Sequence, residues 1–395
     1  MGFACGTFSA VEATIAQALK NAHQTKSMLQ VRFPPPAKDP PKDVTLFDKA
    51  LLGLETADLF ELLQLIETAD FSPPSNYSFT CELYRVTENF AILNSNDLVA
   101  KEENAWIAAN SLIRGKRRWG YAETFTHQLS IDSVIAVGHQ ALDSIKARPY
   151  RGFDPVDRET LVSTAPRFPV IWNYKAIADL LAYSLAPALS RSADQFIDTK
   201  EAQSSPIPIL SKNISIFDDP HIPYGIGSHQ IDQEGVNTEK KTLIERGCLI
   251  SLLATYFEDA EGSNAYRAQY FSDIERSFEI YPQEMPSNLV LDAPGLECKD
   301  LFDLPQGIYI QGVVGVHESF ASTGKFSITA SESFVIDHGN KNPLRTCHIS
   351  GNVYNLLNSI TAVSQTKELV HPTSAPFAIQ TPMIITEGGV SLLIK

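Results

Sequence analysis

Residues 217–235 read Phe217-Asp218-Asp219-Pro220-His221-Ile222-Pro223-Tyr224-Gly225-Ile226-Gly227-Ser228-His229-Gln230-Ile231-Asp232-Gln233-Glu234-Gly235. An apolar run over 214–217 ends in a carboxylate pair and a Pro-X-X-Pro segment, which predicts a buried strand running into a fixed turn. Gly225 and Gly227 permit a positive φ or a close backbone approach that a Cβ would block. We interpret the stretch as a loop joining two domains. A metal site made from its two histidines and four carboxylates is the alternative.

Downstream of this loop the sequence is rich in predicted strands. Apolar runs predict strands over residues 214–217, 242–244, 249–256, 288–291, 308–316, 326–336 and 383–386, and an apolar helix over 353–362. The stretch 259–276 is polar and lacks apolar periodicity, so we expect a loop there. Residues 206–395 are therefore predicted to form a C-terminal β-rich domain, resembling a barrel or a sandwich.

Upstream of the loop, residues 1–205 predict an N-terminal α+β domain. Apolar residues recur at helical spacing over residues 11–23, 56–66, 130–146 and 173–189. From residue 77 the period changes to two, which predicts one hairpin over 78–94 with its turn at Glu88-Asn89, and a second over 106–125. Helices around an antiparallel sheet define the α+β fold class.

Composition restricts the class of protein. The net charge of −14 disfavours direct nucleic-acid binding, which needs clustered Lys and Arg to neutralise phosphates. The five cysteines show no CxxC spacing, which indicates reduced thiols in a cytoplasm. No window approaches eighteen uninterrupted apolar residues, and the first residues are too short and uncharged for a signal peptide. We expect a cytoplasmic protein without membrane or nucleic-acid partners.

Several short motifs together resemble the TldD/PmbA family, in which PmbA is also called TldE. Residues 218–228 followed by 232–235 are similar to that family's junction, D-D-P-x-x-P-x-G-x-G-S and then D-x-E-G. Similar segments follow at residues 238–247, 286–289, 323–327 and 350–352. The resemblance covers the chain from about residue 167 to its end. The N-terminal third matches loosely. The sequence opens on what resembles the second strand, at residues 3–5, so the resemblance leads us to expect that the family's first helix–strand unit is missing here.

The resemblance also implies where catalysis would take place. The TldD branch carries the zinc-peptidase motif H-E-x-x-x-H on the helix after the strand predicted at 168–172, where two imidazoles hold Zn²⁺ and the glutamate acts as base. Aligned without gaps, these positions are occupied by Ala182, Tyr183 and Pro187. None of the three can replace the family's residue, and no cysteine follows Cys347 to supply the family's later ligand. This pattern matches the PmbA branch, which lacks a zinc centre of its own.

Other motifs are weaker. His317-Glu318 begins like HExxH, but Ala321 occupies the second ligand position. Ser228-His229 lacks the final glycine of a nucleophile elbow. We therefore predict no catalytic residue and no metal ligand in this chain.

The function implied by the resemblance is that of a PmbA/TldE-like subunit of a TldD/TldE-type zinc metallopeptidase that processes unfolded peptides. Zinc is then expected in a TldD-like partner of a heterodimer, with a homodimer as the other assembly. This chain would supply chamber wall and peptide contacts, for which Asp218, His221, Tyr224 and His229 are the candidates.

Two alternatives remain open. One is a homodimeric metal-dependent hydrolase with an atypical site that uses Asp218, His221 and His229. The other is a non-proteolytic binding module acting on gyrase-related partners, which the family's older label as a modulator of DNA gyrase suggests. Metal analysis of the purified chain and co-purification from the host would separate these alternatives.

Overall fold

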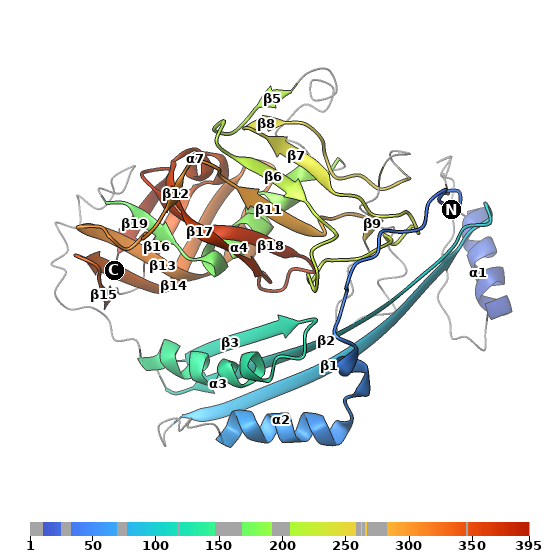
Figure 1. The fold of residues 1–395 in the computed structure, drawn as a ribbon, viewed down its shortest axis with the longest axis horizontal. Coiled ribbons are helices and arrows are strands. Elements are labelled where there is room, and N and C mark those ends of the chain that lie inside the picture. Colours follow the sequence, from blue (N-terminus) through green and yellow to red (C-terminus); the bar gives the residue numbers. More distant parts are fainter. Residues whose placement is uncertain are drawn as a thin grey trace.

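The computed structural model describes residues 11–24, 33–68, 77–116, 119–146, 168–191, 206–257, 262, 265–266, 283–344 and 347–394. The chain forms a helix-flanked, three-stranded antiparallel sheet and a larger, β-rich part (Figure 1). This arrangement confirms the predicted α+β fold class. The predicted strand at 3–5 and most of the polar stretch 259–276 lie outside the described residues.

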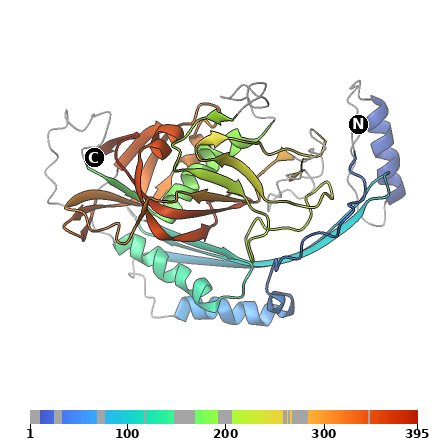
Figure 2. The same ribbon diagram turned by 45° about the horizontal axis from the view of Figure 1, so that its top comes forward.

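The three-stranded sheet has the order β1-β2-β3, with β1 Ser78–Leu93, β2 Val99–Arg114 and β3 Trp119–Thr126. Helices α2 (Thr56–Thr68) and α3 (Ile131–Lys146) pack on it, and their apolar stripes enclose a separate core with the inward residues of β2. Figure 2 shows the sheet lying between these helices and the β-rich part. The remaining N-terminal elements are α1 (Val11–Gln24) and the 3₁₀ turn η2 (Lys49–Gly53).

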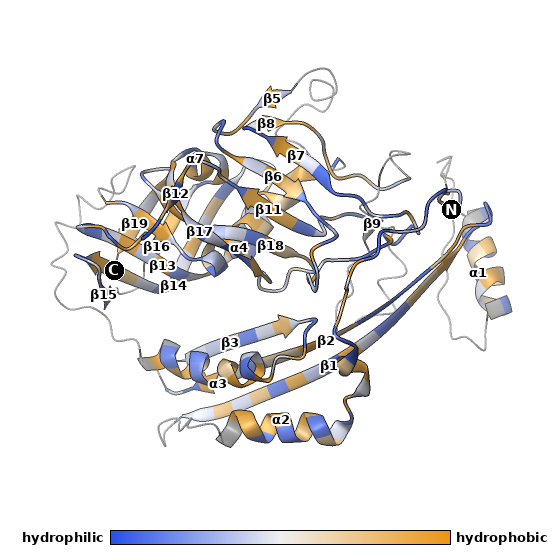
Figure 3. Ribbon diagram, in the orientation of Figure 1, coloured by the Kyte–Doolittle hydropathy of each residue, from blue (hydrophilic) through white to orange (hydrophobic). Residues whose placement is uncertain are grey.

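The turn predicted at Glu88-Asn89 is wrong, because β1 runs without interruption through both residues. The chain instead reverses after Leu93, where the Asn94 side chain accepts from the backbone N–H groups of Asn96 and Leu98. Hydrophobic and hydrophilic residues are mixed along the ribbon, with polar runs at residues 87–89 of β1 and 101–104 of β2 (Figure 3). Because the outer half of the ribbon is two-stranded and its residues are only partly covered, Glu88 and Asn89 fit there without burying a charge or an amide.

In the described residues, the β-rich part is built on one fourteen-stranded sheet whose main path is β19-β16-β14-β13-β4-β18-β11-β6-β7-β8-β5. Strands β12 and β15 add to β17 and β14, and β17 pairs with β18. A separate two-stranded pair is formed by β9 and β10. The strand bounds are β4 Val170–Trp172, β5 Ile207–Pro208, β6 Ser215–Asp218, β7 Lys241–Glu245, β8 Cys248–Leu249, β9 Ala265–Tyr266, β10 Gln283–Glu284, β11 Asn288–Asp292, β12 Glu297–Cys298, β13 Gln306–Val314, β14 Lys325–Asp337, β15 Asn340–Pro343, β16 Cys347–Asn352, β17 Ile360–Val370, β18 Ala378–Thr386 and β19 Val390–Ile394.

Helix α4 (Tyr174–Ser184) lies at the centre of the β-rich part, and both views show strands on several sides of it (Figures 1 and 2). The Asn173 side chain caps its N-terminus by accepting from the Lys175 N–H. Nine of the eleven residues of α4 are buried. The helix therefore packs at the centre of the main hydrophobic core, with the strands of the sheet around it. The short 3₁₀ turn η4 (Val316–Glu318) packs against it.

Three predicted elements are shorter in the structure. The helix predicted over 173–189 ends at Ser184 and continues as the 3₁₀ turn η3 (Ala186–Leu189), because Pro187 has no N–H to extend the α-helical ladder. The helix predicted over 353–362 is α7 (Val353–Asn358), after which β-branched residues begin the unforeseen strand β17. Of the strand predicted at 249–256, only Leu249 is paired as part of a strand, β8, although Leu253 bridges Ser190.

The packing units do not divide at residue 205. Strand β4 pairs with β13 and β18, and α4 packs inside the same sheet, so both belong to the larger part. We therefore propose that the boundary between the two parts lies before β4. The four described cysteines are free thiols. No helix among the described residues is long and apolar enough to cross a membrane.

Candidate functional site

The motif loop, defined here as residues 218–238, begins where β6 ends. The side chain of Asp218 is fully buried, and its Oδ1 accepts from the Ser287 N–H at 2.7 Å. This bond fixes the loop to the segment that leads into β11. In this structure Asp218 therefore holds two backbone segments together and presents no surface to a ligand.

Asn288, at the start of β11, completes that attachment. Its Nδ2 donates to the Asp219 carbonyl at 2.8 Å and to Ser228 Oγ at 2.9 Å, and its Oδ1 accepts from the Gly227 N–H at 3.1 Å. Ser228 Oγ itself donates to the Ile222 carbonyl, so this buried hydroxyl is already used within the loop. Ser228 therefore lacks the free hydroxyl that a nucleophile needs.

Glycine is required at position 227 by close backbone approach. A Cβ on Gly227 would lie 1.7 Å from the Ser287 carbonyl oxygen. The predicted need for a small residue is confirmed at Gly227. The positive φ that was considered for Gly225 and Gly227 is found instead at the neighbouring Tyr224 (57°), whose N–H donates to the Thr45 carbonyl. The Tyr224 side chain is partly exposed, and its candidate role as a peptide contact stays a prediction.

The two histidines of the loop are not brought into a ligand set. His221 Nε2 lies 3.3 Å from Thr238 Oγ1, and His229 Nε2 lies 3.4 Å from Ser287 Oγ. Burial lowers the pKa of both imidazoles, that of His229 to about 4, so His229 is neutral at pH 7. Both rings lie at the partly buried wall of the loop, and their contact with a peptide also stays a prediction.

The Asp219 carboxylate is paired within its own surroundings. Its Oδ1 accepts from the His221 N–H, and its Oδ2 pairs with Lys240 Nζ at 2.8 Å. Burial alone would raise the pKa of Asp219, but the hydrogen bonds from Lys240 and the backbone outweigh burial, and the pKa is lowered. Asp219 is therefore ionised and already paired.

The long hairpin of the N-terminal part reaches the motif loop through Glu102 on β2. Glu102 Oε2 accepts from the consecutive backbone N–H groups of Gln230 at 2.5 Å and Ile231 at 3.3 Å. Burial raises the pKa of Glu102 to about 7. A Cβ on Gly235 would meet side chains at the hairpin tip, so glycine also allows this close fit. Glu102 was not among the residues predicted from the sequence, because its partners lie about 128 residues away along the chain.

The second candidate region is the face of α4 and η3 that carries Ala182, Tyr183 and Pro187. Ala182 is buried in the main core, and Pro187 lies in η3. The Tyr183 hydroxyl donates to the Thr373 carbonyl at 2.6 Å, in the loop 371–377 between β17 and β18. The phenol is thus used as a structural tie at the position where the related motif has a carboxylate.

Polar residues one and two turns earlier on α4 bind the same loop. Asp179 is 2 % exposed and its Oδ1 accepts from the Thr373 N–H at 2.7 Å. Lys175 Nζ donates to the His371 carbonyl and to Thr373 Oγ1, both at 2.9 Å, and pairs with Asp179 at 3.2 Å. Burial raises the pKa of Asp179, while the Lys175 charge and the Thr373 N–H oppose that rise. The loop is therefore held on α4 by four hydrogen bonds, and the ion pair between Lys175 and Asp179 lies within the helix.

This region also joins the two parts of the chain. Lys175 Nζ lies 3.6 Å from Glu123 Oε1 on β3, and the Phe125 and His371 rings are 4.9 Å apart. His127 is 1 % exposed, and burial lowers its pKa to about 4. The α4 face is thus covered by protein rather than by solvent.

The donor set at this face does not fit zinc. A methyl group, a hydrogen-bonded phenol and a pyrrolidine ring stand where two imidazoles and a carboxylate would be required, and the Tyr183 hydroxyl is already used by Thr373. Throughout the part of the chain that the structure describes, no three His, Cys, Asp or Glu side chains gather where they could hold a metal ion. No catalytic step through a metal can be derived from these residues.

Comparison with known proteins agrees with the division of the chain into an N-terminal part and a β-rich part that begins at β4. A family model described as the PmbA/TldA metallopeptidase C-terminal domain matches residues 165–388. An uncharacterized protein of Methanocaldococcus jannaschii is 25 % identical over 373 residues, covering 92 % of this chain and 82 % of that protein. A protein named metalloprotease PmbA homolog, from Buchnera aphidicola, is 27 % identical over 206 residues, covering 50 % of this chain and 41 % of its own length.

Among solved structures, TldE from Thermococcus kodakarensis superposes with a TM-score of 0.73 at 22 % identity, covering 98 % of this chain and 86 % of that one. The class defined by the fold is therefore that of TldE-like two-part α+β proteins, in which a large mixed sheet encloses a central helix. The family model spans more than half of the chain, and the chain belongs to the PmbA/TldD family.

Proposed function

We propose that this chain is a PmbA/TldE-like subunit of a TldD/TldE-type zinc metallopeptidase that processes unfolded peptides in the cytoplasm. The zinc and the general base are supplied by a TldD-like partner, and this chain supplies wall and peptide-positioning surface. The relative named metalloprotease PmbA homolog supports the peptidase assignment.

The observation that carries the proposal is the use of the α4 face. Tyr183, Asp179 and Lys175 all bind the loop 371–377, so the surface that bears the zinc motif in the TldD branch is here a structural joint. The hydrogen bonds between α4 and the loop 371–377 stabilise this chain at the place where a metal centre would otherwise lie. The chain contributes to a peptidase through its partner.

Co-expression tests this proposal. We expect the chain to co-purify with a protein from the same host that carries HExxxH on the equivalent helix, and the pair to cleave unfolded peptides in a chelator-sensitive way. The matched control is the same partner with its motif glutamate changed to Gln, which should assemble and stay inactive. Failure to assemble with any HExxxH-bearing chain of the host would contradict the heterodimer.

The alternative hydrolase built on Asp218, His221 and His229 has no observation in its favour, since Asp218 is buried against Ser287 and the imidazoles are not gathered with it. A direct role on DNA is likewise unsupported, because the chain carries a net charge of −14.

A further inference from the structure

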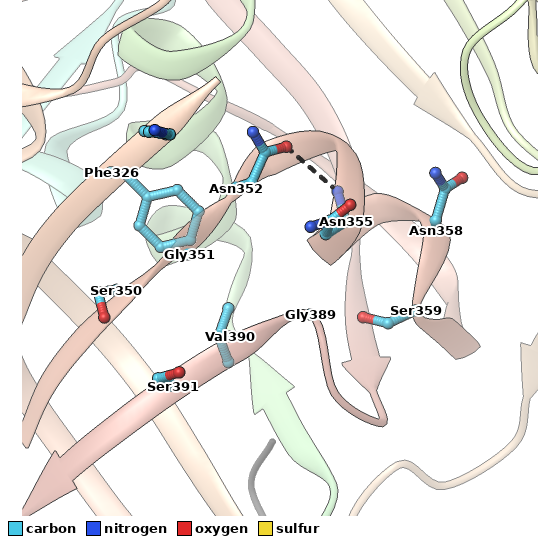
Figure 4. A pocket seen from close by; sticks show the side chains of 11 residues that line it. Phe326, Ser350, Gly351, Asn352, Asn355, Asn358, Ser359, Gly389, Val390 and Ser391 are labelled. Atoms are coloured by element: carbon cyan, nitrogen blue, oxygen red, sulfur yellow. Dashed lines mark hydrogen bonds between the residues drawn. The ribbon is translucent and has the colours of Figure 1, made fainter. Parts of the chain in front are cut away.

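A groove of about 740 Å³, lined by polar and apolar residues, lies on the β-rich part, away from the motif loop and the α4 face. Its walls are the start of β14, the end of β16, the helix α7 and the beginning of β19 (Figure 4). The volume is that of a small-molecule or short-peptide site. Two stretches of the family resemblance, residues 323–327 and 350–352, meet here.

Part of this convergence is structural. The Asn352 side chain caps α7 by accepting from the Tyr354 N–H, and its Nδ2 donates to the Thr323 carbonyl at 2.7 Å. Gly324 has a φ of 68°, and a Cβ there would collide with the Tyr354 ring. These contacts fix α7 and the start of β14 beside the groove, and the Asn352 amide in its lining is already used by them.

Other side chains in the lining are not used. In the described part of the chain, Lys325, Ser350, Asn355 and Ser391 make no side-chain hydrogen bond or ion pair. In the Asn358 side chain only Oδ1 forms a hydrogen bond, accepting from the Ser211 N–H at 2.6 Å. Figure 4 shows the two amides on the α7 wall and the two hydroxyls on neighbouring strands.

The positions of the free hydroxyls follow from the strand register. Ser350 of β16 lies directly opposite Ser391 of β19 and, on its other side, Ser327 of β14. Side chains directly opposite one another share one face of a sheet, with Cβ atoms about 5 Å apart. Lys325 lies two residues before Ser327 and therefore on the same face. One ammonium group is thus placed beside a row of hydroxyls.

The charge of the groove is distinctive in an acidic protein. Its lining contains one cation and no carboxylate, whereas the chain as a whole carries a net charge of −14. An ammonium, hydroxyl groups and amide N–H groups are all donors, which is the set that a carboxylate accepts from. The free amide of Asn355 can donate to and accept from a peptide main chain, and the Asn358 Nδ2 can donate to one.

We propose that this groove binds the C-terminal carboxylate of an extended peptide. Lys325 supplies the counter-charge, Ser350 and Ser391 donate to the carboxylate, and Asn355 and Asn358 bind the adjoining main chain. The peptide as ligand rests on the proposed function, whereas the preference for a carboxylate rests on the groove itself. The site would sort peptides by a free C-terminus and would be indifferent to their side chains.

The test is a binding measurement on the isolated full-length chain by calorimetry. N-acetyl-trialanine as the free acid is compared with its C-terminal amide, with acetate and with inorganic phosphate. We expect the free acid to bind at least tenfold more tightly than the amide or acetate, and its affinity to fall with added salt. Equal affinity for acid and amide would overturn the carboxylate site. Acetate or phosphate binding as tightly as the peptide acid would overturn the peptide as its ligand.

Variants locate the site. Lys325→Met should weaken binding of the free acid at least tenfold, and Ser391→Ala at least threefold, while Lys299→Met, an exposed lysine outside the groove, should leave it unchanged. Binding that survives both groove variants would overturn the assignment. Because no partner is needed, carboxylate binding by a chain that never assembles would uphold the groove and remove the heterodimer.

Discussion

Replacing Gly227 by alanine is the sharpest test of how the motif loop is built. The added Cβ would lie 1.7 Å from the Ser287 carbonyl oxygen, which is half of the 3.4 Å at which ordinary contact begins. It would also lie 2.5 Å from the Ser287 carbonyl carbon. Both atoms belong to the backbone, so no rotamer change relieves the overlap. The loop and the segment before β11 must therefore separate.

The size of the effect follows from what that separation breaks. The Gly227 N–H would lose Asn288 Oδ1, and the Ser287 N–H would move away from the buried Asp218. Overpacking costs about 1–3 kcal/mol, and a buried polar group left unpaired costs about 1–3 kcal/mol. We expect the free energy of unfolding to fall by about 4 kcal/mol, which is a large part of the stability of an ordinary domain.

Urea unfolding at fixed pH, followed by tryptophan fluorescence, to which the fully buried Trp172 contributes from the β-rich part, measures this loss. Gly53→Ala is the matched control, because a Cβ at Gly53 meets nothing within 4 Å. The control should stay within about 0.5 kcal/mol of the parent. A Gly227→Ala protein that unfolds within about 1 kcal/mol of the parent would refute the close approach.

Three further predictions concern pH and the α4 joint. The pKa of Glu102 is about 7 in the folded protein, against an ordinary value of 4.5. Its contribution to stability, up to about 3 kcal/mol, is therefore fully present below pH 4.5 and is lost as the pH rises through 7. Glu102→Gln should abolish this pH dependence, which urea titrations at pH 5.5 and 8 measure. The pH dependence that His127 contributes to stability has the opposite sign. Its pKa is lowered to about 4, so its contribution is present above pH 6.5 and is lost as the pH falls toward 4. The stability of the His127→Gln variant should therefore fall less steeply in acid than that of the parent. Tyr183→Phe removes the 2.6 Å bond to Thr373 and should lower the unfolding free energy by about 1 kcal/mol, whereas an unchanged value would show that the phenol is not a tie.

Local chemistry made much of the fold predictable. The strand before Asp218, the turn after it and the small residue at Gly227 all follow from short-range patterns of proline, glycine and apolar residues. The predicted helix over 130–146 agrees with α3 because apolar residues keep their spacing through it. The turn at Glu88-Asn89 failed because a two-stranded ribbon tolerates polar residues on both faces, so alternation alone does not mark its end.

The site contacts could be predicted only in part, because they join distant segments. Glu102 meets Gln230 across 128 residues, and Tyr183 meets Thr373 across 190. Neither pair has a local signature, and a carboxylate on a strand is usually solvated. The resemblance did identify Ala182, Tyr183 and Pro187, but the hydrogen bonds from Tyr183 and its neighbours to the loop 371–377 are seen only in the folded structure.

The central claim is that this chain holds no zinc of its own and works through a partner that does. The direct measurement is the zinc content and peptide cleavage of the purified full-length chain, alone and after assembly with an HExxxH-bearing chain. We predict far less than one zinc per chain and no cleavage for the protein alone, with zinc and chelator-sensitive cleavage arriving together with the partner. One tightly bound zinc per isolated chain, with peptide cleavage that a chelator abolishes, would contradict the account.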